Sequence, residues 1–71
     1  MKTRGTTALR EELARRGWTQ ADLARRLGVN SGVVANWLSG SRNPKIKWAL
    51  ELEMLLGLDV RLWAMPSRER M

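Results

Sequence analysis

Four glycines divide this chain into short segments, and they constrain its fold more than any other feature. The four residues Gly17, Gly28, Gly40 and Gly57 each follow a segment in which apolar residues recur at helical spacing. Glycine commonly ends a helix, because it adopts the left-handed backbone conformation without a steric penalty. No segment shows the alternation of apolar and polar residues that is typical of a β-strand. The pattern therefore predicts an all-α fold built from short helices.

The residues between the glycines predict five helices. The first covers about residues 7–16, and the last is a short helix over residues 60–65. Thr19 and Asn30 precede the second and third helices, where their side-chain oxygens can accept hydrogen bonds from free backbone N–H groups. Pro44 suits the first turn of the fourth helix, because its fixed φ angle matches a helix and it has no N–H to satisfy.

The length of 71 residues predicts a single domain, residues 1–71. Its ordered core is expected over about residues 7–65, with flexible tails at residues 1–6 and 66–71. The chain has no cysteine and no histidine, so we expect no disulfide, no metal site and no cofactor. We also expect no catalytic residues, because the carboxylates fit helix surfaces and no glycine-rich phosphate loop is present. With no signal peptide and no membrane span, a cytoplasmic protein is the expected class.

The charge of the chain favours an anionic partner. There are 13 Lys and Arg against 7 Asp and Glu, a formal net charge of +6. Residues 1–50 hold ten basic and three acidic side chains (+7), whereas residues 51–71 hold three and four (−1), and the two parts sum to +6. The first two-thirds of the chain are therefore expected to face nucleic acid or another polyanion. A membrane surface is disfavoured, because basic and apolar residues do not share one long amphipathic helix.

The second and third predicted helices are separated by only two or three residues, which is the arrangement of a helix-turn-helix. The segment "TQADLARRLGVNSGVVANWLSGSRNP" resembles the Cro/C1 (XRE) family of phage and bacterial repressors. This resemblance implies a compact five-helix, lambda-repressor-like DNA-binding domain over about residues 7–65, without a catalytic role. The residues at matching positions are Gln20, Leu23, Ala24, Leu27, Gly28, Val29, Val34, Trp37, Gly40 and Pro44.

The third predicted helix has two different sides. Val34, Trp37 and Leu38 form an inward-facing seam at helical spacing. The opposite side is small and polar, and the resemblance implies that it contacts base edges in the DNA major groove. Asn36 is the strongest candidate there, because a carboxamide can bond adenine at two atoms, which discriminates by about 1–3 kcal/mol against a wrong base. The alternative is a merely solvated face. The expected base-contact residues are Asn30, Ser31, Gly32, Val33 and Asn36.

Phosphate contacts are expected at both ends of the helix-turn-helix. The resemblance places Gln20 against the DNA backbone at the start of the second helix, and it places the loop after the third helix there too. Such contacts fix the position of a protein on DNA and supply much of its affinity. The expected phosphate-contact residues are Gln20, Arg42, Asn43 and Lys45.

The C-terminal third is more apolar than one small core requires. We assign Ile46, Ala49, Leu50, Leu52 and Leu56 to the core of the monomer. The remaining apolar residues predict a homodimer, a two-fold arrangement that suits a pseudo-palindromic operator. The alternative is that the core needs all of these residues, both tryptophans included. The expected dimer interface consists of Leu55, Val60, Leu62 and Trp63.

The resulting hypothesis is a Cro-like repressor, bacterial or phage-encoded, that binds double-stranded DNA as a homodimer. Two other binding roles fit the same build. The chain could be the DNA-binding antitoxin of a toxin–antitoxin pair, with its apolar C-terminal third against the toxin. It could also be an adaptor that has kept the fold but binds protein, for instance RNA polymerase.

Overall fold

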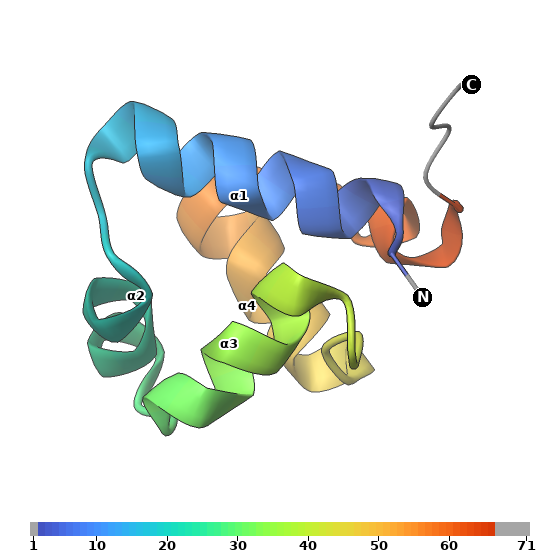
Figure 1. Cartoon of the computed structure of the whole chain (residues 1–71). Helices are drawn as coiled ribbons and strands as arrows, with labels where there is room; N and C mark the ends of the chain where they lie inside the picture. Colours follow the sequence, from blue (N-terminus) through green and yellow to red (C-terminus); the bar gives the residue numbers. More distant parts are fainter. Residues whose placement is uncertain (1, 67–71) are drawn as a thin grey trace.

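Four α-helices and one 3-10 helix make up the part of the chain that the structure, a computed structural model, describes, residues 2–66 (Figure 1). Their bounds are α1 Arg4–Arg16, α2 Gln20–Leu27, α3 Ser31–Ser39, α4 Ile46–Leu56 and η1 Val60–Ala64. Over residues 2–66, pairing of the β type is limited to one isolated bridge between Thr3 and Pro66. The predicted all-α fold with a helix-turn-helix is confirmed.

The helix ends follow the chemistry of their capping residues. Thr19 and Asp22 form a capping box at the start of α2, in which each side chain accepts a hydrogen bond from the other residue's backbone N–H. Asn30 caps α3 by accepting a hydrogen bond from the backbone N–H of Gly32 at 2.8 Å. Gly28 ends α2 in the left-handed conformation, with φ of 75°. Because Gly28 ends α2 and Asn30 already caps α3, the connection between the two helices is short.

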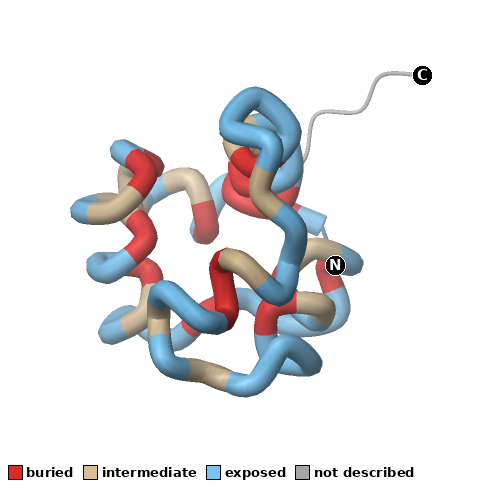
Figure 2. Tube along the Cα trace, turned by 90° about the vertical axis from the view of Figure 1, so that its left-hand side faces the viewer, coloured by how far each residue is buried: buried red, intermediate tan, exposed pale blue. Residues whose placement is uncertain are grey.

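One apolar core holds the helices together. α1 packs on α3 and η1, α2 packs on α3, and α4 packs on η1. Figure 2 shows the buried residues on the inner sides of the chain trace and the exposed residues on the outside. α3 packs into this core through Val34 and Trp37, so the opposite side of the helix is exposed to solvent. The buried apolar residues are Leu9, Leu13, Leu23, Ala24, Val34, Trp37, Ala49, Leu52, Leu56, Leu58 and Trp63.

The first helix begins earlier than the sequence predicted, at Arg4 and not at residue 7. Thr3 is its N-cap and exchanges hydrogen bonds with Thr6, and both threonines are buried. Residues 3–6 therefore belong to the packed domain, and the expected flexible tail of residues 1–6 is wrong for them. The physical reason is that η1 covers this first turn of α1. Of the expected tail 66–71, Pro66 pairs with Thr3, and residues 67–71 lie outside the described part of the chain.

The start of α4 also differs from the prediction. Lys45 is the N-cap in an extended conformation, with ψ of 162°, and the first helical residue is Ile46. Pro44 therefore lies just outside the helix, where it is buried. The extended backbone at Lys45 delays the helix, so the proline closes the preceding loop instead of opening the first turn.

The division of apolar residues in the C-terminal third was predicted wrongly in part. Ile46 and Leu50, assigned to the core, are 68% and 46% exposed, whereas Trp63, assigned to a dimer interface, is only 6% exposed. The reason lies in α1, because the indole ring of Trp63 packs against the backbone of Gly5, where a side chain would collide with it. η1 thereby contributes Trp63 to the core, whereas Ile46 and Leu50 lie on the exposed side of α4.

Candidate nucleic-acid interface

The helix-turn-helix is formed by α2, a turn of residues 28–30, and α3. The backbone N–H of Val29 donates to the carbonyl of Ala24 at 3.0 Å, which closes the end of α2. The side-chain amide of Gln20 donates to the carbonyl of Ser31 at 3.5 Å, so the start of α2 lies beside the start of α3. The two predicted DNA contacts Gln20 and Ser31 are therefore neighbours in space.

The outer side of α3 is exposed, polar and uncharged. Ser31, Gly32, Val33 and Asn36 are all exposed, whereas Val34 is fully buried on the inner side. This division agrees with the predicted inward seam, except that Leu38 is only half-buried at its edge. A helix face without charge and without large side chains can approach base edges closely.

Asn30 and Asn36 differ in how free their side chains are. The carboxamide oxygen of Asn30 is occupied by the cap of α3, which leaves its amide group as a donor. The carboxamide of Asn36 has no hydrogen-bond partner within residues 2–66, although its backbone carbonyl accepts from Ser39 and Arg42. Asn36 therefore keeps both its donor and its acceptor for a ligand.

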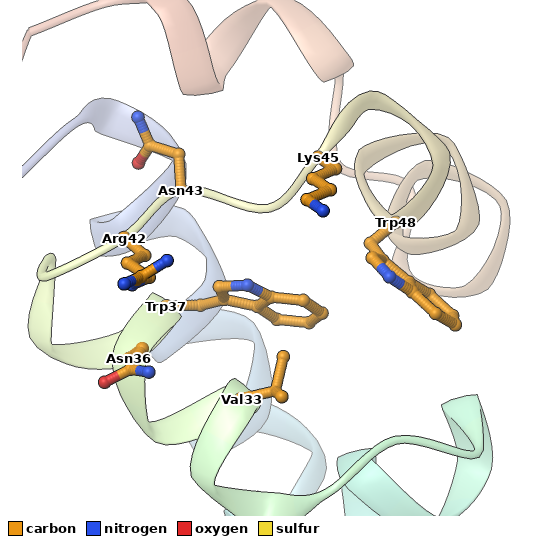
Figure 3. A pocket seen from close by; sticks show the side chains of 7 residues that line it. All are labelled: Val33, Asn36, Trp37, Arg42, Asn43, Lys45 and Trp48. Atoms are coloured by element: carbon orange, nitrogen blue, oxygen red, sulfur yellow. The ribbon is translucent and has the colours of Figure 1, made fainter.

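A hollow of about 400 Å³ opens between α3 and the start of α4 (Figure 3). Asn36 and Arg42 lie at one end of it and Trp48 at the other. The hollow is thus lined by two of the predicted base-contact residues, Val33 and Asn36, and by three predicted phosphate contacts. The residues that line it are Val33, Asn36, Trp37, Arg42, Asn43, Lys45 and Trp48.

Positive charge is uncompensated at this hollow. Among residues 2–66, neither Arg42 nor Lys45 has a carboxylate within ion-pair distance. In addition, Lys45 makes no side-chain cap, so the first backbone N–H groups of α4 remain available. A helix N-terminus of this kind attracts anions. The rim of the hollow is therefore suited to a phosphate.

The basic residues of α1 and α2 are engaged elsewhere. Glu12 pairs with two arginines, and the hydrogen bond from Arg16 holds the pKa of Glu12 below its usual value. Hydrogen bonds from Thr19 lower the pKa of Asp22, with a smaller contribution from Arg25. The guanidinium of Arg26 stacks 4.1 Å from the ring centre of Trp18, and that of Arg10 donates to the carbonyl of Leu38. Arg15, Arg16, Arg25 and Arg26 therefore have partners on the surface of their own helices or on Trp18.

The side chain of Asn43 is held within the fold. Its amide nitrogen donates to the backbone carbonyl of Trp63 at 3.4 Å, so it is directed toward the end of η1 (Figure 3). Asn43 thus ties the loop after α3 to η1. Figure 3 shows Arg42 beside Asn36 and Lys45 farther along the same hollow, toward Trp48, whereas the side chain of Asn43 is bonded to η1.

One residue of this surface was missed by the sequence analysis. Trp48 is half-buried, lines the hollow, and carries the ammonium of Lys47 at 4.8 Å from the centre of its ring. Its place in an apolar, helical run favoured a role in the core or in association. The available signal was its position in the first turn of α4, next to the basic loop.

Other kinds of site find no support in the described part of the chain. Residues 2–66 contain no group of three or more acidic side chains placed to hold a metal ion. No helix within this range is long and apolar enough to cross a membrane.

Comparison with known families identifies the family of this fold. A family model described as helix-turn-helix matches residues 9–63, from the middle of α1 into η1. The comparisons with curated proteins and with solved structures gave no match. The family match covers most of the chain and includes the whole α2–α3 unit. The chain therefore belongs to the Cro/C1-type helix-turn-helix family of DNA-binding regulators.

Proposed function

We propose that this protein is a transcriptional repressor that binds a pseudo-palindromic operator as a homodimer, with α3 in the major groove. The observation that carries the proposal is the hollow beside α3, which is lined by Asn36 and by the cations Arg42 and Lys45. Within residues 2–66, the carboxamide of Asn36 has no hydrogen-bond partner and neither cation has an ion-pair partner. Repression follows from occupancy, because a bound dimer excludes RNA polymerase from the operator. Its place of action is the cytoplasm of a bacterium, on bacterial or phage DNA.

Base recognition is assigned to the outer side of α3. Asn36 reads adenine through its carboxamide, while Ser31 bonds several bases and discriminates less. Gly32 lets the DNA come close, and Val33, which is 37% exposed, can contact a thymine methyl group. Asn30 contributes only through its amide donor, because its oxygen caps the helix.

Phosphate recognition is assigned to both sides of that helix. Arg42 and Lys45 hold the backbone together with the free N–H groups at the start of α4. Gln20 holds it at the start of α2. We give Asn43 a different role, since its side chain fixes the loop to η1 and so positions Arg42.

Selection of duplexes from a random library, followed by affinity measurements over a salt series, tests this function. We expect one short sequence to be enriched as an inverted repeat, with half-sites about one DNA turn apart, ~34 Å. Affinity should fall steeply with salt, because phosphate contacts release counterions. A library without any enriched sequence would refute the proposal of a specific repressor.

A further inference from the structure

α4 exposes a line of large apolar side chains to solvent. Ile46, Leu50 and Met54 are 68%, 46% and 84% exposed, and they follow one another at intervals of four residues. Residues with this spacing lie one above the other on one side of a helix. We call these three residues the α4 stripe. It lies on a different side of α4 from Ala49, Leu52 and Leu56, which enter the core.

The residues that the sequence assigned to a dimer interface offer less exposed surface. Trp63 is buried, Leu55 and Val60 pack against the core, and Leu62 is half-buried. In contrast, three of the five large apolar residues exposed among residues 2–66 belong to the α4 stripe; the other two are Val33 on α3 and Met65. The apolar surface available for association is therefore on α4.

The charges beside the α4 stripe are self-complementary. Lys47 and Glu51 are separated by one helical turn and lie on the same side of the stripe. Neither of them has an ion-pair partner within residues 2–66, and the ammonium of Lys47 only stacks on Trp48. If two α4 helices meet antiparallel along the stripe, Lys47 of each lies near Glu51 of the other. In a parallel pair, Lys47 of one copy would instead lie at the same height along the helix axis as Lys47 of the other, and Glu51 at the same height as Glu51.

Net charge also favours this surface for self-association. The chain carries +6, which opposes the approach of two copies. From Lys45 to Leu56, two lysines are balanced by two glutamates, Glu51 and Glu53, so this segment has no net charge. Two copies can therefore meet at α4 without the repulsion that separates their basic faces.

We propose that the α4 stripe is the surface through which two copies of this chain associate, antiparallel and about a two-fold axis near Leu50. Leu50 then packs on Leu50 of the second copy, and Ile46 packs on its Met54. Lys47 and Glu51 form two equivalent ion pairs across the axis. The proposal names the interface of the homodimer, and it rests on the proposed function only for the role of that dimer on DNA.

The free dimer is weak by this geometry. α4 has 11 residues and is about 16 Å long, so a helix pair of this size buries little area compared with a stable interface. On an operator, binding of one copy raises the effective concentration of the second, which strengthens the contact without new surfaces. Association therefore has to be measured at high protein concentration and also on DNA.

Sedimentation equilibrium of the whole chain at micromolar to millimolar concentrations tests the interface directly. Leu50→Glu places a charge at the axis, and we expect the dimer dissociation constant to rise by roughly thirtyfold or more. Met65→Glu, which adds the same charge at another exposed apolar position, should leave that constant unchanged. Circular dichroism confirms that both variants keep the helical fold, as expected for exposed positions.

Charge reversal tests the antiparallel arrangement independently. Lys47→Glu places two glutamates next to each other across the axis, and Glu51→Lys does the same with two lysines. Each single change is expected to weaken association, and the double variant Lys47→Glu/Glu51→Lys is expected to restore it. A double variant that is as weak as the two single variants would overturn the antiparallel pairing.

Two further outcomes separate this interface from the proposed function. If Leu62→Glu breaks the dimer and Leu50→Glu does not, the interface lies at η1 and the proposal fails, while the repressor function stands. If Leu50→Glu breaks the dimer but the wild-type chain enriches no duplex, the repressor function fails and the interface stands. A wild-type chain that stays monomeric both free and on DNA overturns the α4 interface.

Discussion

The indole ring of Trp63 lies against the backbone of Gly5, in the space that a Cβ atom at Gly5 would fill. The first turn of α1 and the helix η1 therefore approach each other more closely than a residue with a side chain at position 5 would permit. The backbone N–H of Arg4 adds a hydrogen bond to the carbonyl of Met65 at 2.9 Å. This contact keeps Trp63 out of the surface and closes the core on the side opposite α2.

Gly5→Ala is expected to destabilise the fold. Alanine is the better helix former by up to about 1 kcal/mol, but the added methyl group collides with Trp63. Overpacking of this kind lowers the free energy of unfolding by about 1–3 kcal/mol. Urea unfolding followed by circular dichroism measures the change. Thr7→Ala, at an exposed position of the same helix, should change it by less than about 0.5 kcal/mol, and equal effects of both variants would argue against the collision.

Asn36→Ala and Arg42→Ala should affect DNA binding differently. Asn36→Ala is expected to relax the preference at one base pair, a loss of about 1–3 kcal/mol of discrimination. Arg42→Ala is expected to weaken all duplexes alike and to reduce the salt slope by about one unit, because it removes the proposed phosphate contact. Affinities for the selected operator and for single-base variants, each over a salt series, distinguish the two. An equal loss on all sequences for Asn36→Ala would exclude it from base reading.

Arg10 is expected to stabilise the position of α3. Its guanidinium donates to the carbonyl of Leu38 at 2.5 Å, at the negative end of the α3 dipole. Arg10→Met removes this bond between α1 and α3, and we expect a loss of about 1 kcal/mol, or about 4–8 °C in melting temperature. The melting temperature of Arg10→Lys, which keeps the charge, should lie between those of Arg10→Met and the wild-type chain. Thermal unfolding measures the series, with the exposed neighbour Glu11→Gln as the control.

Below about pH 8, the stability of the fold should depend on pH only in acid. Hydrogen bonds lower the pKa of Glu12 and Asp22, and those from Arg61 lower the pKa of Asp59 to about 2. Because these folded-state pKa values lie below the unfolded ones, the unfolded chain binds more protons in acid and stability falls there. The loss begins near the ordinary carboxyl values of 3.8 and 4.5 and continues toward about pH 2.

Between about pH 5 and pH 8 the urea midpoint should be constant. The chain contains no histidine, so no side chain is expected to titrate between about pH 5 and pH 8. Urea midpoints at a series of pH values test the whole profile. Asp59→Asn should remove the part of the stability loss that occurs at the lowest pH, near 2. A midpoint that changes near neutral pH would contradict this assignment of the titrating groups.

Local chemistry made much of the fold predictable. Asn30 and Thr19 act within a few residues of their own positions, so the ends of α2 and α3 can be inferred without knowledge of the rest of the chain. The same holds for the inward side of α3, because Val34 and Trp37 follow from helical spacing alone. The same helical spacing predicts that Asn36 is exposed, on the side opposite Val34.

The parts that could not be predicted depend on contacts between distant segments. The sequence does not say that Gly5 makes room for Trp63, and without this contact Ile46 and Leu50 are the natural choices for the core. The side chain of Asn43 is another example, because its bond to the carbonyl of Trp63 exists only once η1 is docked. In each case the deciding partner is at least 20 residues away.

The pairing of Thr3 with Pro66 has a consequence for how the protein is made. A ribosome completes residues 3–6 long before residues 60–66, so the first turn of α1 has no packing partner until η1 has left the exit tunnel. α2 and α3 are neighbours along the chain, and their mutual contacts do not depend on η1. A chain that stops before residue 60 would therefore contain the whole helix-turn-helix, but it would lack the contact of η1 with the first turn of α1.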